Sequence, residues 1–163
     1  MSRTFRVAQP YLFMQLILYN IRSRFNVGAI FRTADAAGVE KIYLCGITPR
    51  PPHPKIDKVS LGAERYIPFE YTKQTLPLLK KLKQEKTQLV AVEQSKKSFP
   101  YYKFRAKKNM ALILGNEVKG LPKKILDLAD KIVEIPMHGQ KESLNVAVAT
   151  GVVLFEMIKR NNK

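Results

Sequence analysis

Three clusters of polar side chains each follow a short apolar run of this sequence. The first contains Asn26 and Arg32, the second contains Glu117, and the third contains Asn145. Amide, guanidinium and carboxylate groups bind and orient polar or anionic substrates. Proteins with α/β sheets build their sites directly after the strands, so we expect these clusters to form a site. The clusters span residues 20–35, 112–122 and 135–147.

Each cluster also has a purely structural interpretation. Asn26 is a typical N-cap for a helix that ends at Gly38, with Arg32 pairing with Asp35 inside it. The Gly and Asn residues of the second cluster suit a turn before a helix opened by Pro122. Ser143 is a typical N-cap for the last helix, and Asn145 suits its first turn. Taken one at a time, the clusters leave both interpretations open.

Two common kinds of site are missing from the sequence. It contains neither the glycine pattern of dinucleotide-binding folds nor a P-loop, which argues against ordinary dinucleotide and ATP enzymes. The two histidines, His53 and His138, lie far apart, and neither has a second ligand at zinc-like spacing. We therefore expect no metal site.

Short apolar runs alternate with helical patterns along the whole chain, which predicts an α/β fold. Strands that are apolar on both faces, such as that at 12–19, indicate a mainly parallel sheet with helices on both faces. The proline-rich stretch 48–54 is expected to stay outside the sheet. The last helix carries a single apolar stripe, which consists of Leu144, Val148, Gly151, Val152, Phe155 and Ile158.

The length of the chain predicts its number of domains, and its cysteine content predicts its cellular compartment. A chain of 163 residues fits a single domain over 1–163, and no apolar run approaches the roughly 18 residues of a membrane span. Arg3 and Arg6 precede an apolar stretch that Gln15 interrupts, so we expect neither a signal peptide nor a membrane partner. Cys45 is the only cysteine and lies in an apolar run, which favours a buried thiol and a cytoplasmic protein.

The charge predicts a polyanionic partner. The chain has 29 basic and 13 acidic residues, a net charge of +16 and a pI near 10.0. Such a surplus attracts nucleic acid, because binding phosphates releases their counterions. The alternative is an ordinary solvated lysine surface.

Together the three clusters resemble the motifs of the SpoU or TrmH-type RNA methyltransferases of the SPOUT superfamily. The matching segments are NVGAIFRTAD, LGNEVKGLP and IPMHGQKESLNVAVATGVVLFE, in that order. The likeness extends from about Leu16 to Glu156, and three motifs in order are far more specific than any one of them. It implies a C-terminal trefoil knot whose loops hold S-adenosylmethionine, and a homodimer with active sites near the subunit interface.

The resemblance also implies roles for particular residues. Asn26, Arg32, Glu117 and Asn145 match the functional polar positions of the family. The implied reaction moves a methyl group from S-adenosylmethionine to a ribose 2'-hydroxyl of tRNA or rRNA. The cofactor slot would be lined by Leu114, Gly115, Ile135, Met137, Ser143 and Leu144.

Two roles remain open for Arg32, which the family assigns to activating the 2'-hydroxyl. A guanidinium stays protonated, so proton abstraction by Arg32 is chemically demanding, and we favour stabilisation of the developing alkoxide. The sequence does not identify the RNA or its modified nucleotide. Candidate RNA contacts are the basic and aromatic stretch 98–108 and the residues Arg50, Lys55, Lys58 and Arg65.

A non-catalytic, basic RNA-binding module is the main alternative. It would need the charge but not Asn26, Arg32, Glu117 and Asn145 together. A second alternative is another methyl transfer, to a base nitrogen or to a ribose of a different RNA. Only the family likeness favours the 2'-oxygen over a base nitrogen.

Overall fold

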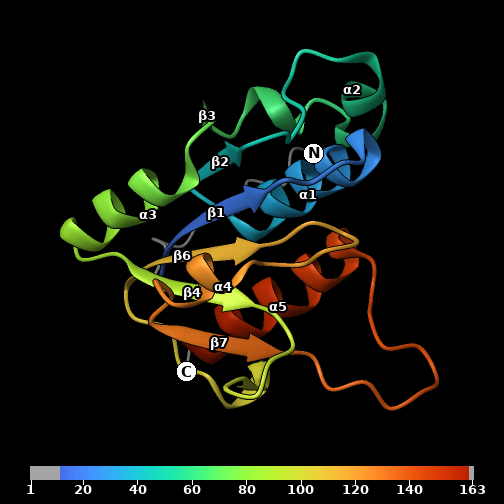
Figure 1. The fold of residues 1–163 in the computed structure, drawn as a ribbon. Coiled ribbons are helices and arrows are strands. Elements are labelled where there is room, and N and C mark those ends of the chain that lie inside the picture. The colour runs from blue at the N-terminus through green and yellow to red at the C-terminus, as the bar shows by residue number, and fades with distance from the viewer. Residues whose placement is uncertain (1–11, 162–163) are drawn as a thin grey trace, which may run out of the picture.

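The computed structural model describes residues 12–161, in which seven strands form one sheet in the order β3-β2-β1-β6-β4-β7-β5 (Figure 1). All neighbouring strands run parallel, which confirms the predicted α/β class. The strands are β1 (Phe13–Tyr19), β2 (Lys41–Cys45), β3 (Phe69–Thr72), β4 (Gln88–Val92), β5 (Phe99–Pro100), β6 (Asn109–Leu114) and β7 (Lys131–Glu134). The helices are α1 (Arg24–Ala37), α2 (Pro54–Ser60), α3 (Thr75–Gln84), α4 (Lys123–Leu126) and α5 (Val146–Asn161), with 3₁₀ turns at Ala63–Arg65 and Tyr101–Lys103.

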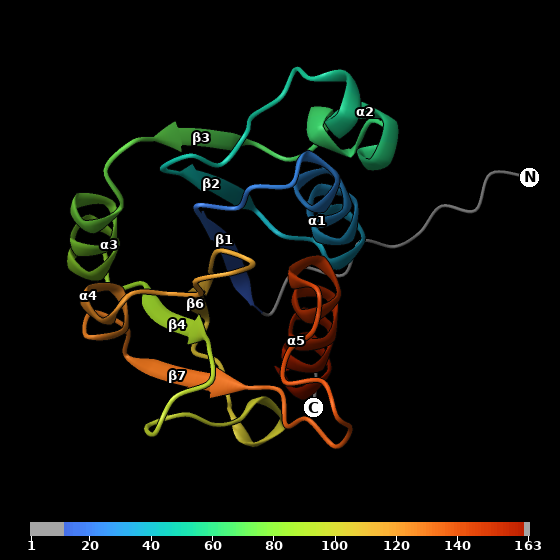
Figure 2. The same cartoon turned by 45° about the vertical axis from the view of Figure 1, so that its right-hand side comes forward.

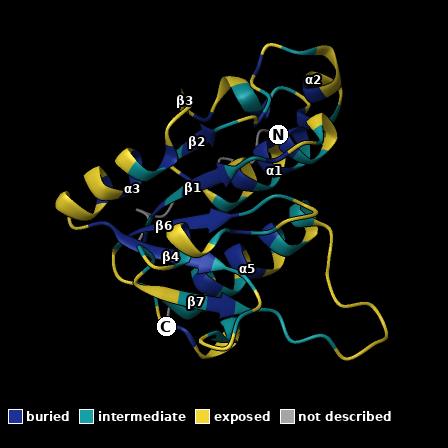
Figure 3. Ribbon diagram, in the orientation of Figure 1, coloured by how far each residue is buried: buried dark blue, intermediate teal, exposed yellow. Residues whose placement is uncertain are grey.

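Helices cover both faces of the sheet, with α1 and α5 on one side and α3 and α4 on the other (Figure 2). Strand residues alternate between the two layers: Leu16 and Leu18 join the cluster beneath α1 and α5, and Ile17 joins the cluster beneath α3. Burial of both faces explains why the strands read as continuous apolar runs. The buried strands at the centre and the exposed outer surface of α3 are visible in Figure 3.

The strand register brings the segments that follow the strands to one edge of the sheet. Tyr19 pairs with Cys45, and Leu114 pairs with both Leu18 and Val92. Since parallel strands end together, the segments after β1, β2, β4 and β6 emerge side by side. The first two polar clusters of the sequence are therefore neighbours in space.

Two predicted helix starts are wrong by a few residues. The N-cap of α1 is Ser23, whose Oγ accepts from the Asn26 backbone N–H, so Asn26 lies in the first turn. Helix α5 begins at Val146 and is capped by Asn145, not Ser143. In both cases a nearby polar residue takes the capping position and competes with the predicted one. The predicted end at Gly38 is confirmed by its left-handed φ of 71°.

Much of the apolar stripe of the last helix faces outward. The buried residues of α5 are Thr150, Val153, Leu154 and Met157. By contrast, Val148 and Phe155 are 53% and 49% exposed. The part of the stripe formed by Val148, Val152 and Phe155 therefore faces outward, whereas Ile158 packs against the core.

In the basic and aromatic stretch, most of the aromatic rings serve the fold. Phe104 is buried, and Phe99 and Tyr101 pack against the same core cluster, whereas Tyr102 is exposed. We still predict that the exposed basic residues of this stretch contact RNA. The loop before Pro54 contains no strand, as its prolines predict.

Two features expected from the sequence are not described by the structure. Arg3 and Arg6 lie outside the described residues, and the trefoil knot stays a prediction. No helix within residues 12–161 is long and apolar enough to cross a membrane.

Candidate active site

Side chains from all three polar clusters meet in one hydrogen-bonded network. Asn26 Nδ2 donates to Glu117 Oε1 at 3.0 Å, and Asn145 Nδ2 donates to Asn26 Oδ1 at 3.0 Å. These residues come from the start of α1, the turn after β6 and the start of α5. Three of the four predicted polar residues are thus brought together, and we call them the amide–carboxylate network.

The carboxylate of Glu117 is held by the backbone at the start of α1. Its oxygens accept from the Arg22 N–H at 2.9 Å and from the Ser23 N–H at 3.1 Å. Partial burial alone would raise the pKa of Glu117, but these two backbone bonds and the bond from Asn26 hold its pKa below the ordinary value. Glu117 is therefore ionised at neutral pH and suited to accepting hydrogen bonds, not to removing a proton from a hydroxyl.

Asn145 joins helix α5 to the network. Its Oδ1 accepts from the backbone N–H of Ala147 at 2.9 Å and of Val148 at 3.3 Å, which caps the helix. With Oδ1 held by the cap, Nδ2 of Asn145 is turned toward Asn26 and donates to its Oδ1. One residue therefore sets both the start of α5 and the orientation of the Asn26 amide.

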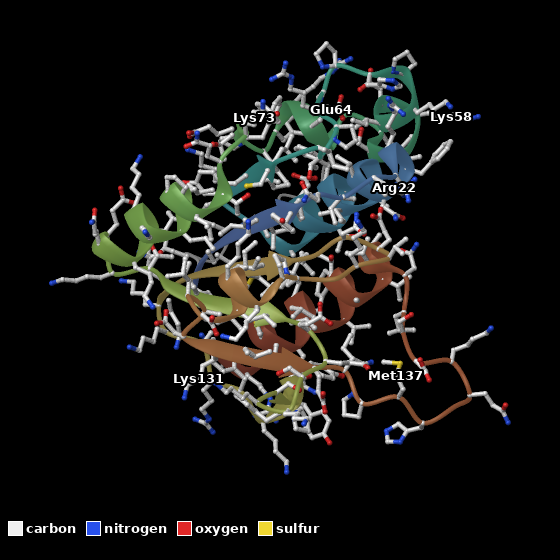
Figure 4. All side chains as sticks on the ribbon, viewed as in Figure 1. Arg22, Lys58, Glu64, Lys73, Lys131 and Met137 are labelled. Atoms are coloured by element: carbon white, nitrogen blue, oxygen red, sulfur yellow. The ribbon has the colours of Figure 1, made fainter. Side chains whose placement is uncertain are left out.

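A hollow of about 190 Å³ lies beside the network, where β4, β7 and the loop before α5 meet. Four of the six residues predicted to bind a cofactor line this hollow: Ile135, Met137, Ser143 and Leu144. Figure 4 shows Met137 on the loop that follows β7. We call this hollow the β7 slot.

The other two predicted slot residues, Leu114 and Gly115, do not line the β7 slot. Leu114 is buried in the core, and Gly115 lies against the turn that follows it. A Cβ on Gly115 would come within 2.8 Å of the backbone of Gly120. Glycine is thus needed here to let the turn fold back tightly.

Four acidic or amide residues of the β7 slot were missed by the sequence analysis: Glu93, Gln94, Glu134 and Glu142. Gln94 Nε2 donates to the Glu142 carbonyl at 2.6 Å, and Glu93 Oε2 accepts from the Leu121 N–H at 2.8 Å. Glu93 and Gln94 directly follow β4, so the rule that sites lie at strand ends already pointed to them.

The residues of the β7 slot fit the chemistry of S-adenosylmethionine. Ile135, Met137 and Leu144 offer an apolar surface to an adenine ring. In a chain with only 13 acidic residues, three carboxylates line this one hollow, which suits the cationic ammonium and sulfonium groups. The slot therefore combines the two surfaces that the cofactor needs.

Arg32 stands apart from the network. It is exposed and forms no hydrogen bond or ion pair with any residue of 12–161, so the predicted pair with Asp35 is not formed. It lies six residues beyond Asn26 on α1, which places it about 9 Å further along the helix axis. The structure leaves its guanidinium available to a substrate or a second chain.

No three His, Cys, Asp or Glu side chains within the described part of the chain are arranged to hold a metal ion.

Comparisons with known proteins agree with the geometry. A family model described as the SpoU rRNA Methylase family matches residues 14–155. A tRNA (guanosine(18)-2'-O)-methyltransferase of Aquifex aeolicus is 35% identical over 138 residues, covering 84% of this chain and 64% of the relative.

Two solved structures extend the likeness to three dimensions. An AdoMet-bound rRNA methyltransferase from Sinorhizobium meliloti has a TM-score of 0.81 and 31% identity, over 90% of this chain and 56% of that one. A structure described under 2'-OH methylation of C/U34 on tRNA has a TM-score of 0.83 and 25% identity, over 93% of this chain and 98% of that one. The chain spans about three fifths of the length of the curated relatives it matches.

Proposed function

Because this chain belongs to the SpoU rRNA methylase family, we propose that it transfers a methyl group from S-adenosylmethionine to a ribose 2'-hydroxyl of RNA. The observation that carries the proposal is the amide–carboxylate network, which joins the three motifs directly beside the β7 slot. A non-catalytic RNA-binding module would need neither. We further propose that residues 1–163 form one methyltransferase domain.

S-adenosylmethionine is proposed to bind in the β7 slot, with adenine against Ile135, Met137 and Leu144. Ser143 also lines the slot, and Gly115 is proposed to act on it through the turn of residues 115–121, because Gly120 of that turn lies against Glu93 of the slot. Leu114 is buried at the end of the strand before this turn. The bound cofactor supplies a methyl group on a positively charged sulfur. The protein excludes water from this group and aligns the ribose oxygen with it.

The four polar residues divide into positioning and stabilising roles. Glu117 fixes Asn26, and Asn145 fixes both Asn26 and the start of α5, so these three residues orient the loops around the ribose. Arg32 is proposed to contact the RNA and to stabilise negative charge on the 2'-oxygen, because its guanidinium stays protonated. The proton of the 2'-hydroxyl would pass to an oxygen of the adjacent RNA phosphate as the methyl group leaves the cofactor sulfur, which becomes a neutral thioether.

Transfer RNA is the substrate class we propose. The net charge of +16 supports a polyanionic substrate. The solved structure described under methylation of C/U34 on tRNA resembles this chain over 98% of that structure's length, which supports a tRNA substrate. The buried, unpaired Cys45 and an RNA substrate together support a cytoplasmic site of action.

A homodimer is proposed from the outward-facing stripe of α5. Val148, Val152 and Phe155 are exposed on successive turns of the helix. Phe25 on the neighbouring helix α1 is also 51% exposed. An apolar surface that spans two adjacent helices is typical of a protein interface, and a second copy of the chain is the occupant we propose.

Calorimetric titration with S-adenosylmethionine tests the cofactor proposal. Wild-type and Arg32→Ala proteins are expected to bind equally, because Arg32 lies outside the slot. Met137→Trp is expected to abolish binding by filling the slot, whereas His138→Trp, an exposed neighbour outside it, keeps binding.

Transfer of radiolabelled methyl groups to unmodified tRNA transcripts then tests the reaction. Arg32→Ala is expected to lower the rate roughly 100-fold or more with cofactor affinity unchanged. Wild-type protein that binds tRNA but no S-adenosylmethionine, even with tRNA present, would contradict the proposal and favour the RNA-binding module.

A further inference from the structure

We propose that a second cleft, between the loops after β2 and β6, binds a nucleotide of the RNA next to the methylated one. This cleft has a volume of about 390 Å³ and shares no residue with the β7 slot. Its apolar walls receive the base, and its cationic rim receives the phosphate. The inference rests on the proposed function, because it takes RNA as the substrate.

The two walls of the cleft carry unusually exposed apolar side chains. Ile47 is 67% exposed and Val118 is 75% exposed, and both line the cleft. They come from segments more than 70 positions apart in the chain, so their meeting at one cleft is a product of the fold. Two aliphatic side chains beside the same hollow offer an apolar surface on which a base can pack.

Two linked asparagines hold these walls in place. Asn20 Oδ1 accepts from the Ile47 N–H at 3.0 Å, and Asn116 Oδ1 accepts from the Val118 N–H at 2.9 Å. Asn116 Nδ2 in turn donates to the Asn20 carbonyl at 2.7 Å. The apolar tips are thus presented on preformed loops, which lowers the entropy cost of binding a ligand between them.

The charge of the cleft suits a phosphate. Arg22 and Lys119 line it, and none of its lining residues is acidic. Through Tyr19 and Asn20 it continues into a hollow of about 350 Å³ that is lined by Lys73 and Lys124, again without an acidic residue. A single strand of RNA would therefore meet cations along the whole path, as in grooves that track a nucleic acid backbone.

The position of the cleft links it to the reaction. Gly120 lines the cleft, and Glu93 lines the β7 slot. A Cβ added at Gly120 would lie 2.3 Å from Oε2 of Glu93, so the two residues are in close contact. The turn of residues 116–120 is therefore a thin wall between the two hollows. In Figure 4, Arg22 lies near the start of α1 and Lys73 between β3 and α3, whereas Met137 lies on the separate loop after β7.

Binding of unfractionated bacterial tRNA at several salt concentrations separates the two kinds of contact. The Ile47→Ser, Val118→Ser double variant is expected to lose about tenfold in affinity with an unchanged salt dependence, because base contacts release no counterions. Lys119→Ala is expected to lower the slope of log affinity against log salt by about 1. Neither change should alter binding of S-adenosylmethionine.

Matched controls remove the same chemical groups elsewhere on the surface. Leu61→Asn removes a side chain that is 66% exposed at a left-handed position that asparagine tolerates, and Lys80→Ala removes an exposed cation of α3. Both variants are expected to keep the contribution of the apolar contacts to tRNA affinity. Lys80→Ala also removes one positive charge from the surface of the protein, which Leu61→Asn does not.

The outcomes distinguish this inference from the proposed function. A double variant that binds tRNA as tightly as wild-type protein, while wild-type protein methylates tRNA normally, would overturn the inference alone. A double variant whose sedimentation changes without loss of tRNA affinity would assign the cleft to a second copy and also overturn it. Absence of S-adenosylmethionine binding by wild-type protein would count against the proposed function, and absence of tRNA binding against both.

Discussion

At the residue scale, the carboxylate of Glu117 is stabilised by donors that all belong to the start of α1. Two backbone N–H groups and Asn26 Nδ2 point at it, in the region where the helix dipole also favours negative charge. The turn after β6 is thereby fastened to α1 across 95 positions of sequence. Glu117 is thus important for geometry as well as for any contact with substrate.

Replacing Glu117 by glutamine is expected to lower the free energy of unfolding by about 1 kcal/mol at neutral pH. This value lies at the low end for hydrogen bonds to a charged group, because Glu117 is exposed and solvent screens its charge. Since the folded-state pKa of Glu117 is lowered, its stabilisation is fully present above the unfolded pKa of about 4.3 and is lost as the pH falls through the folded value. Urea denaturation of both proteins at several pH values measures this difference.

The control for that measurement is Glu40→Gln, which removes an exposed carboxylate with no side-chain hydrogen bond to any residue of 12–161. A stability difference between wild-type and Glu117→Gln proteins that stays constant down to strongly acidic pH would contradict the hydrogen-bonded, ionised state of Glu117.

Cys45 is expected to be inert in the folded protein. Burial raises the pKa of its thiol to about 12, an effect that a hydrogen bond with Thr75 only partly offsets. Because the thiolate is the reactive form, iodoacetamide should not label the native protein at mildly alkaline pH but should label it fully in urea. Mass spectrometry measures the labelling, and rapid stoichiometric reaction of the native protein would show that the thiol is accessible.

At the element scale, α1 is pressed closely against α2. A Cβ added at Gly28 would lie 2.6 Å from the carbonyl oxygen of Ile56 and 3.0 Å from Val59 Cβ. The close approach sets how α1 sits on the loop and helix that follow β2. Gly28 is therefore a packing residue of the first motif.

Gly28→Ala is expected to lower the free energy of unfolding by about 1–3 kcal/mol, because the backbone of α2 must move to admit the methyl group. Gly139→Ala is the matched control, since its Cβ would meet no atom within 4 Å. Chemical denaturation followed by circular dichroism compares the two variants. A stabilised Gly28→Ala protein would mean that the helices separate easily and that the intrinsic helix preference of alanine dominates.

The sequence indicated the central strands because both faces of the sheet are buried there, which makes β1, β4 and β6 continuous apolar runs. It gave no such signal for the exposed strand β3 or for the two-residue strand β5. It predicted the meeting of Asn26, Glu117 and Asn145 only through the family likeness. Helix starts were harder, since Ser23 competes with Asn26, and Asn145 with Ser143, for neighbouring cap positions. The cleft between Ile47 and Val118 was unpredictable, because isolated apolar residues in turns carry no periodic signal.

At the scale of the whole molecule, the two sides of helix α5 have different tasks. Val153, Leu154 and Met157 pack against the sheet, whereas Val148, Val152 and Phe155 are exposed. The periodicity of the sequence indicated an apolar stripe but not which surface it meets. A helix that is apolar on both sides is expected where one side belongs to the core and the other to an interface.

Charge at Val152 and Phe155 is therefore expected to separate the proposed dimer. Wild-type protein should sediment at twice the 18.6 kDa mass of the chain, and the Val152→Lys, Phe155→Lys double variant at the mass of one chain. Tyr66→Lys is the control, at a side chain that is 77% exposed and follows the 3₁₀ turn Ala63–Arg65, and it should leave the mass unchanged. Analytical ultracentrifugation over a range of concentrations measures the masses, and circular dichroism checks folding.

The dimer and the cofactor are expected to be coupled, because Leu144 lines the β7 slot and is itself 44% exposed just before α5. A partner chain that covers the α5 stripe would also limit the movement of the loop before it. The monomeric double variant should accordingly bind S-adenosylmethionine several-fold more weakly, since the loop must then be ordered by the cofactor alone. A folded monomeric variant with wild-type cofactor affinity would show that each chain completes its slot without a partner, whereas a monomeric wild-type protein would contradict the dimer itself.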